Sequence, residues 1–153
     1  MKQDRFLLVI LGVIGLLIVL AVVLFFARQG PQEYGPEDTP EGVLRNYVLA
    51  LQNEDYARAY KYLQDAEGKP DFTQFRQRFL AMDMSRERTS VQIGEVDQAD
   101  DEAVVGLIIT YGGNQPFTSN WSENDAALVT RQDGEWKLTY MPYPYWDWDW
   151  YSE

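Results

Sequence analysis

The chain has 153 residues, a net charge of −11, and neither histidine nor cysteine. Without histidine it cannot build histidine general bases, Ser-His-Asp or Cys-His catalytic sites, the usual zinc sites or histidine-ligated haem. Without cysteine it cannot form disulfides, so the folded part must rely on packing. We predict no cofactor site and no metal site, and any catalysis would have to use carboxylates, tyrosine or lysine.

The first distinctive segment is Phe6 to Ala27, a run of 22 residues without a charge. A helix of this length is about 33 Å long, enough to cross a hydrocarbon core of about 30 Å. We therefore predict that residues 1–28 are a transmembrane anchor that contacts the lipid bilayer through residues 6–27. A cleaved signal peptide is disfavoured, because its apolar core is shorter and a small-x-small cleavage site is missing here. A buried soluble helix is disfavoured because the segment is apolar on every face.

The charges beside the anchor predict its orientation. Lys2 and Arg5 precede it, whereas Arg28 alone follows before the chain becomes acidic. Because cytoplasmic flanks are enriched in Lys and Arg, we expect a single-pass protein with a cytoplasmic N-terminus. The soluble domain would then be extracytoplasmic, either periplasmic or on the cell surface.

The remainder of the chain is strongly acidic. From Gln29 onward it has 10 basic residues (13 minus 3) and 23 acidic ones (24 minus 1), a net charge of −13. Such a domain is repelled by nucleic acid and by anionic lipid surfaces, so we predict no nucleic-acid partner. The charge would suit a cationic partner surface, although it also serves solubility alone.

The sequence then divides into a linker, a domain and a tail. Residues 29–38 contain two Gly-Pro pairs and are predicted to be a linker. The domain, residues 39–140, begins with three amphipathic helices. The first starts at Thr39 and stops at Asn53, the second covers Tyr56 to Leu63, and the third follows the capping residue Asp71.

From about Arg88 the period of the apolar residues changes to that of strands. Asp133-Gly134 is a strong hairpin signal, and an acidic turn is expected from Asp97 to Glu102. Three helices followed by an antiparallel meander predict an α+β fold in which the helices cover one face of a curved sheet. The predicted strands are 88–96, 103–111, 117–121, 126–131 and 135–140.

Two phrases carry a resemblance to a known family. Leu44–Leu63 (LRNYVLALQNEDYARAYKYL) resembles the opening helices of the nuclear-transport-factor-2-like, or cystatin-like, superfamily, and Leu128–Leu138 (LVTRQDGEWKL) resembles its final hairpin. The resemblance implies a cone from Thr39 to Tyr140, often with a pocket at its open end. Members include isomerases, dehydratases, small-molecule binders and non-catalytic assembly domains. The Asp base and Tyr/Asp oxyanion hole of members that resemble ketosteroid isomerase cannot be placed on particular residues here.

The tail, residues 141–153, reads MPYPYWDWDWYSE. In an extended conformation its tryptophans would line one edge and its aspartates the other. Burying such side chains contributes about 1.5–3 kcal/mol each, so the tail should be docked. It could pack on its own domain, on a partner protein or in the membrane interface, and a sugar-binding platform is a fourth reading. The predicted partner-binding residues are Tyr143, Tyr145, Trp146, Asp147, Trp148, Asp149, Trp150 and Tyr151.

A group of tyrosines and an acidic turn can each be interpreted either as a binding site or as an ordinary structural feature. Tyr47, Tyr56, Tyr60 and Tyr62 cluster on the first two helices of the domain, and Tyr47, Tyr56 and Tyr60 in particular could line a pocket with hydroxyl donors. Helical stripes of this kind more often pack between helices and sheet. The acidic turn from Asp97 to Glu102 could bind calcium, but it lacks the ligand spacing of a known loop and is expected to be a solvated hairpin tip.

These features support three hypotheses. The first is a non-catalytic, single-span accessory subunit of a larger membrane complex, with the domain and tail as a docking or stabilising module. The second is a membrane-tethered binder of a small apolar ligand in the cone pocket. The third is a carboxylate-based isomerase or dehydratase, which requires a buried acid with a raised pKa facing a cavity.

Overall fold

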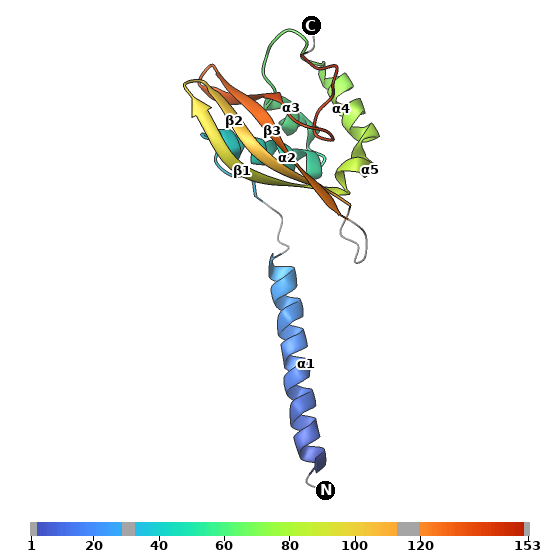
Figure 1. Ribbon diagram of the computed structural model, residues 1–153. Helices are drawn as coiled ribbons and strands as arrows, with labels where there is room; N and C mark the ends of the chain where they lie inside the picture. The colour runs from blue at the N-terminus through green and yellow to red at the C-terminus, as the bar shows by residue number, and fades with distance from the viewer. Residues whose placement is uncertain (1–2, 29–32, 113–119, 152–153) are drawn as a thin grey trace. The chain divides into compact units, whose positions relative to one another are not determined.

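The structure, a computed structural model, describes residues 3–28, 33–112 and 120–151. The chain divides into two compact units after Glu33. The first contains the helix α1, Gln3–Arg28 (Figure 1). Within it, Leu7–Phe25 has a mean hydropathy of 3.5 and none of it is buried. The helix therefore has the length and composition of a membrane span, properties that an N-terminal signal sequence would share.

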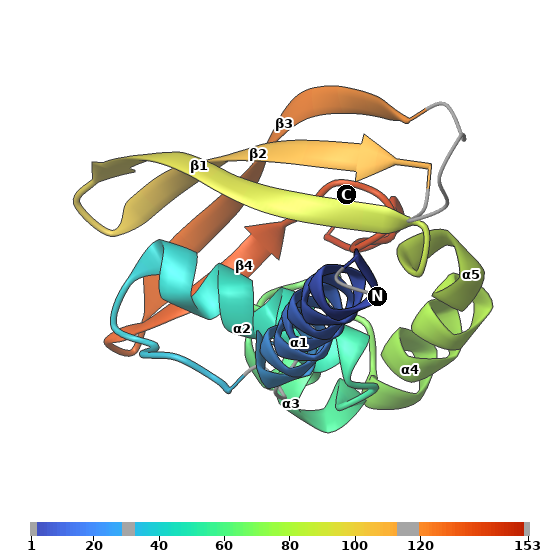
Figure 2. The ribbon, with the colours of Figure 1, turned by 90° about the horizontal axis from the view of Figure 1, so that it is seen from below.

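The second unit is an α+β domain, as predicted (Figures 1 and 2). Its helices pack on one face of a four-stranded antiparallel meander in the order β1-β2-β3-β4. The short helix α5 was not predicted. The helices are α2 (Pro40–Gln52), α3 (Tyr56–Lys61), α4 (Phe72–Ala81) and α5 (Asp83–Arg86), and the strands are β1 (Thr89–Ala99), β2 (Glu102–Tyr111), β3 (Trp121–Gln132) and β4 (Glu135–Tyr140).

Capping side chains place the starts of the three predicted helices. The Thr39 hydroxyl accepts the Gly42 N–H at 3.2 Å, and the Asp55 carboxylate accepts the Arg58 N–H at 3.1 Å. Asp71 and Gln74 form a reciprocal capping box. Each cap satisfies a backbone donor that the first helical turn leaves unpaired, so these helices begin where the sequence predicts.

The sheet differs from the prediction at two places. β1 continues to Ala99 and β2 begins at Glu102, so the predicted acidic turn is reduced to Asp100 and Asp101. β3 begins at Trp121, five residues before the predicted strand at 126. Polar side chains along its first half hide the apolar alternation that identifies a strand. Most of the predicted strand 117–121 lies outside the described residues.

One continuous core joins the helices, the sheet and the tail. Strand β2 alternates, so that every second side chain from Ala103 to Ile109 is buried under α2. Trp136 and Leu138 extend this layer along β4. The same core contains Met141, Tyr145, Trp146 and Trp150, which follow the last strand. The tail is therefore part of the domain interior.

Part of the predicted linker also packs on the domain. The buried Asn46 side chain accepts the Gly35 N–H and donates to the Gly35 carbonyl, both at 2.8 Å. The Arg58 guanidinium lies 3.6 Å from the centre of the Tyr34 ring. Within the predicted linker 29–38, residues 34–38 thus lie against α2 and α3, and residues 29–32 are outside the described part of the chain.

Replacing Asn46 by Ala should lower the free energy of unfolding by about 1–3 kcal/mol, because it removes both bonds to Gly35 from a buried position. Urea denaturation of the full chain in detergent, followed by circular dichroism, measures this change. The control Asn53→Ala alters an exposed side chain and should stay within about 0.5 kcal/mol of the wild type. Equal effects of the two substitutions would contradict the packing of residues 34–38.

Candidate functional site

The tail folds back on its own domain, and its three tryptophans do not share a face. Trp146 and Trp150 are 4% and 8% exposed, whereas Trp148 is 78% exposed. The tail is not extended here, because the Trp150 N–H donates to the Asp147 carbonyl at 3.3 Å and closes a turn. The turn breaks the alternation of an extended chain, so Trp146 and Trp150 point inward while Trp148 points outward.

The inward tryptophans complete an aromatic cluster with α4. Trp150 is stacked on Phe75 with ring centres 5.3 Å apart, and it meets Phe79 edge-on at 5.5 Å. Trp146 meets Trp150 edge-on at 5.2 Å and is stacked on Tyr151 at 5.8 Å. Such pairs contribute about 0.5–1.5 kcal/mol each beyond the burial of their surface. We call Phe75, Phe79, Trp146 and Trp150 the tail cluster.

Polar contacts fix the tail in this position. The buried Tyr47 hydroxyl donates to the Tyr145 carbonyl at 2.8 Å, and burial raises the pKa of Tyr47 well above its usual value. Burial also raises the pKa of Tyr145 to about 12. The Asp147 carboxylate, which is 7% exposed, forms an ion pair with Arg78 at 2.5 Å. These contacts tie the tail to α2 and α4.

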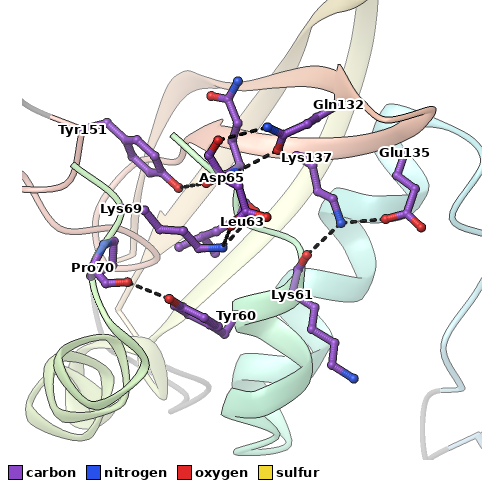
Figure 3. Close-up of polar contacts among 11 residues, drawn as sticks. Tyr60, Lys61, Leu63, Asp65, Lys69, Pro70, Gln132, Glu135, Lys137 and Tyr151 are labelled. Atoms are coloured by element: carbon purple, nitrogen blue, oxygen red, sulfur yellow. Dashed lines mark hydrogen bonds and ion pairs between the residues drawn. The ribbon is translucent and has the colours of Figure 1, made fainter. Parts of the chain in front are cut away.

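The end of the described tail meets the loop between α3 and α4 (Figure 3). The Tyr151 hydroxyl donates to the Gln64 carbonyl at 2.5 Å, and the Tyr151 N–H donates to the Gly68 carbonyl at 3.1 Å. A Cβ atom on Gly68 would lie 2.7 Å from the Tyr151 Cα, and Gly68 has a φ of +83°. Both the close approach and the backbone conformation therefore require glycine.

The same loop is joined to the β3–β4 hairpin. Gln132 accepts the Asp65 N–H at 2.8 Å and donates to the Asp65 carbonyl at 2.9 Å (Figure 3). Lys137 donates to the Lys61 carbonyl at 3.0 Å, and Tyr60 donates to the Pro70 carbonyl at 2.8 Å. The loop thus connects the tail, the hairpin and the helices.

The predicted partner-binding residues divide into an inner and an outer set. Tyr145, Trp146, Asp147 and Trp150 are buried, and Tyr151 is half-buried. Tyr143, Trp148 and Asp149 are exposed. Asp147, Asp149 and Trp150 line an open hollow of about 510 Å³ beside Arg78 and Ala81 of α4. The outer set therefore offers a partner more accessible surface than the inner set.

The three predicted pocket tyrosines lie in the packing between helices and sheet. Tyr47 is fully buried and hydrogen bonded, as described above. Tyr56 is buried, and its hydroxyl has no hydrogen-bond partner among the described residues. Tyr60 packs edge-on against Phe72 and Phe75 at 5.5 and 5.3 Å. Tyr62, the fourth tyrosine of the cluster predicted from the sequence, lines a cleft.

That cleft, of about 560 Å³, is lined by charged side chains together with the apolar side chains of Val43, Ala57 and Trp136. The Glu37 carboxylate accepts the Tyr62 hydroxyl at 2.6 Å and the Arg58 guanidinium at 3.1 Å, while the Arg58 Nε donates to the Tyr62 hydroxyl at 3.0 Å. The hydrogen bond from Tyr62 is the main cause of the lowered pKa of Glu37. Burial raises the pKa of Tyr62 to about 12. The cleft is lined by Glu37, Asp55, Arg58, Lys61, Tyr62 and Lys137.

Two carboxylates of the domain, Glu37 and Asp65, are stabilised in their ionised forms. Asp65, like Glu37, has a lowered pKa, in this case because Lys69 donates a hydrogen bond to it. A general acid needs the opposite shift. Among the described residues, no three acidic side chains come together as metal ligands. The predicted acidic turn is split between the ends of β1 and β2.

Comparison with known proteins supports the fold. No family model and no curated protein matches this chain. Among solved structures, a SEC-C-motif protein from Rhodopseudomonas palustris aligns at 13% identity over 69% of this chain and 79% of its own, with a TM-score of 0.52. A proposed ketosteroid isomerase from Shewanella frigidimarina aligns at 20% identity over 67% and 92%, with a TM-score of 0.51.

A protein of unknown function with a cystatin-like fold, from Nostoc punctiforme, aligns at 18% identity over 63% of this chain and 80% of its own, with a TM-score of 0.48. At these identities the likeness concerns the fold alone. The two structures with TM-scores of 0.52 and 0.51 support the α+β fold of the domain.

Replacing Trp150 by Ala should lower the free energy of unfolding by about 3–5 kcal/mol, because it opens a cavity in the tail cluster. Trp148→Ala removes an equally large but exposed side chain, and its effect should stay within about 0.5 kcal/mol. Urea denaturation of both variants tests the pair. Similar losses for the two variants would contradict the inward and outward placement of the tail.

Acid should weaken the contacts of Glu37. Because the pKa of Glu37 is lowered in the folded state, its contribution to stability is present above its unfolded pKa of 4.5 and is lost as pH falls through the folded value. The melting temperature of Glu37→Gln should therefore lie below that of the wild type at neutral pH, and the difference should shrink as the pH falls below 4.5 through the lowered folded pKa. Glu67→Gln, an exposed loop position, is the control. A difference independent of pH would refute the ionised contact.

Proposed function

We propose that this protein is a non-catalytic, single-span accessory subunit of a larger membrane complex. Helix α1 anchors it, with the N-terminus in the cytoplasm, as the flanking cations Lys2 and Arg5 favour. The acidic α+β domain lies on the extracytoplasmic side and docks on a protein partner there. The outer face of the tail supplies the contact.

The observation that carries this proposal is the occupation of the domain interior by its own tail. Tyr145, Trp146 and Trp150 lie in the same buried cluster as Phe75 and Phe79. Side chains of the chain itself therefore fill the space between α4 and the sheet, where a ligand of a cone-shaped domain would be held. A filled interior favours a role carried by the outer surface.

The two alternatives receive less support. A small apolar ligand would have to displace the buried tail, which is held by the Asp147–Arg78 ion pair and by Tyr47. An isomerase or dehydratase would need a carboxylic acid with a raised pKa, and both Glu37 and Asp65 are shifted the other way. The likeness to a proposed ketosteroid isomerase extends to fold alone at 20% identity.

The outer set of the tail has the composition of a docking surface. Trp148 is an exposed indole flanked in the chain by Asp147 and Asp149. Tryptophan is among the residues that contribute most to protein interfaces. The charge of −13 after the anchor (10 basic and 23 acidic residues) favours a cationic protein surface and opposes insertion into anionic lipid. Trp148 would then contact a basic patch of the partner.

Photo-crosslinking in native membranes tests the proposal. A p-benzoylphenylalanine at position 148 should give one discrete adduct with a membrane protein, whereas the same probe at Leu80, an exposed position on α4, should not. Trp148→Ala should weaken co-purification of that protein while leaving the melting temperature unchanged. Equal crosslinking from both positions, or unchanged co-purification of the variant, would refute docking through the tail.

A further inference from the structure

A second surface of the domain is an open sheet edge. β2 pairs with β3 along nearly its whole length, from Trp121 to Thr130. β4 pairs with β3 only from Leu128 to Gln132. Residues 121–127 of β3 therefore have β2 on one side and, within the described part of the chain, no strand on the other. Figure 2 shows this half of β3 along the rim of the sheet, where β4 has diverged from it.

The hydrogen-bonding groups at this edge can be assigned. The Arg131 N–H donates toward β2, to the Asp101 carbonyl at 2.7 Å, and the Leu128 carbonyl accepts the Thr139 hydroxyl on the β4 side at 3.2 Å. Because these directions alternate along a strand, even-numbered residues of β3 point their N–H and C=O groups to the open side. Ala126 fits this assignment, because its N–H donates to the Asp125 carboxylate at 2.7 Å and not to the backbone of β2.

The side chains beside the open edge form a row of one aromatic and two acidic groups. Trp121, Glu123 and Asp125 share the face of β3 that carries the buried Ala127. Trp121 is 57% exposed and is stacked on Tyr111 at 4.4 Å with the rings 18° apart. The Glu123 carboxylate accepts the Tyr111 hydroxyl at 2.6 Å. The indole and the first carboxylate are thus held in place before any partner arrives.

The opposite edge of the sheet is less suited to pairing. β1 has a register shift between Ile93 and Val96, which interrupts the regular alternation of its bonding groups. Bulges of this kind are one way in which proteins protect sheet edges. The first half of β3 pairs with β2 without any such shift. It is therefore the edge with a regular template for another strand.

We propose that the open half of β3 binds an extended segment of a protein partner that carries basic residues at alternate positions. The segment adds to the sheet through the backbone groups of Ser122 and Asn124. Its Lys or Arg side chains lie opposite Glu123 and Asp125, and one of them covers the free face of Trp121.

Charge selects this occupant over a second copy of the chain. Pairing β3 with β3 would bring Glu123 and Asp125 of the two copies together, and like charges across strands are destabilising. Anionic lipid is disfavoured by the same two carboxylates. The proposal goes beyond docking through Trp148, because it concerns a different surface and recognition by backbone pairing, and either one can fail without the other.

The test uses the full chain in phosphatidylcholine nanodiscs and a fluorescein-labelled peptide of about nine residues that alternates lysine with threonine. Fluorescence anisotropy should show saturable binding, and hydrogen exchange should slow at Ser122 and Asn124. Asn124→Pro should weaken binding at least about tenfold, because it removes an open-side N–H that pairing with β2 does not use. Asp125→Asn keeps the acceptor for Ala126 and should weaken binding about three- to fivefold, with Glu41→Gln as the matched control.

Several results would overturn the proposal. One is no binding up to about 1 mM peptide. Others are equal affinity for the wild type and Asn124→Pro, or equal affinity for a peptide in which glutamate replaces lysine. Self-association of the protein without peptide that Asn124→Pro abolishes would assign the edge to a second copy instead. If Asn124→Pro alters the melting temperature, the peptide affinities of Asp125→Asn and Glu41→Gln are compared instead. Equal affinities of these two variants would overturn the proposal.

Discussion

The packing of Trp146 and Trp150 against Phe75 and Phe79 is the constraint on which the rest of the domain depends. It places the tail between α4 and the sheet, as both views of the ribbon show (Figures 1 and 2). Once the tail is there, Tyr47 of α2 can bind the Tyr145 carbonyl, and Tyr145 can reach the Thr89 carbonyl of β1 at 3.4 Å. The tail therefore connects α2, α4 and β1.

Because the tail fills the interior of the domain, the outer surface is the better candidate for a functional site. Closely packed aromatic side chains leave little room for a ligand without a rearrangement of the tail. What faces outward is the indoles of Trp148 and Trp121, many carboxylates and, among the described residues, one open edge of β3, all of which are means of protein recognition. The ion pair of Glu37 and Arg58 has a different role, because it fastens residues 34–38 to the helices.

The sequence predicts the parts of the fold that depend on local signals. Thr39 and Asp71 mark two of the helix starts, and Asp133-Gly134 marks the last hairpin. It could not predict which tail tryptophans face inward, because that depends on a turn between Asp147 and Trp150. Nor could it predict the docking of Gly35, because the partner amide of Asn46 lies 11 residues away. The start of β3 was missed because Glu123 and Asp125 are polar on the face where core residues are expected.

The most direct test of the central claim is fluorine NMR of the full chain labelled with 5-fluorotryptophan, in detergent, with a soluble paramagnetic agent. Single Trp→Phe variants assign the five resonances. A tail that fills the domain predicts that the signals of Trp146 and Trp150 stay sharp while that of Trp148 broadens strongly. Equal broadening of all three tail tryptophans would show that the tail lies outside the domain, and the account would fail.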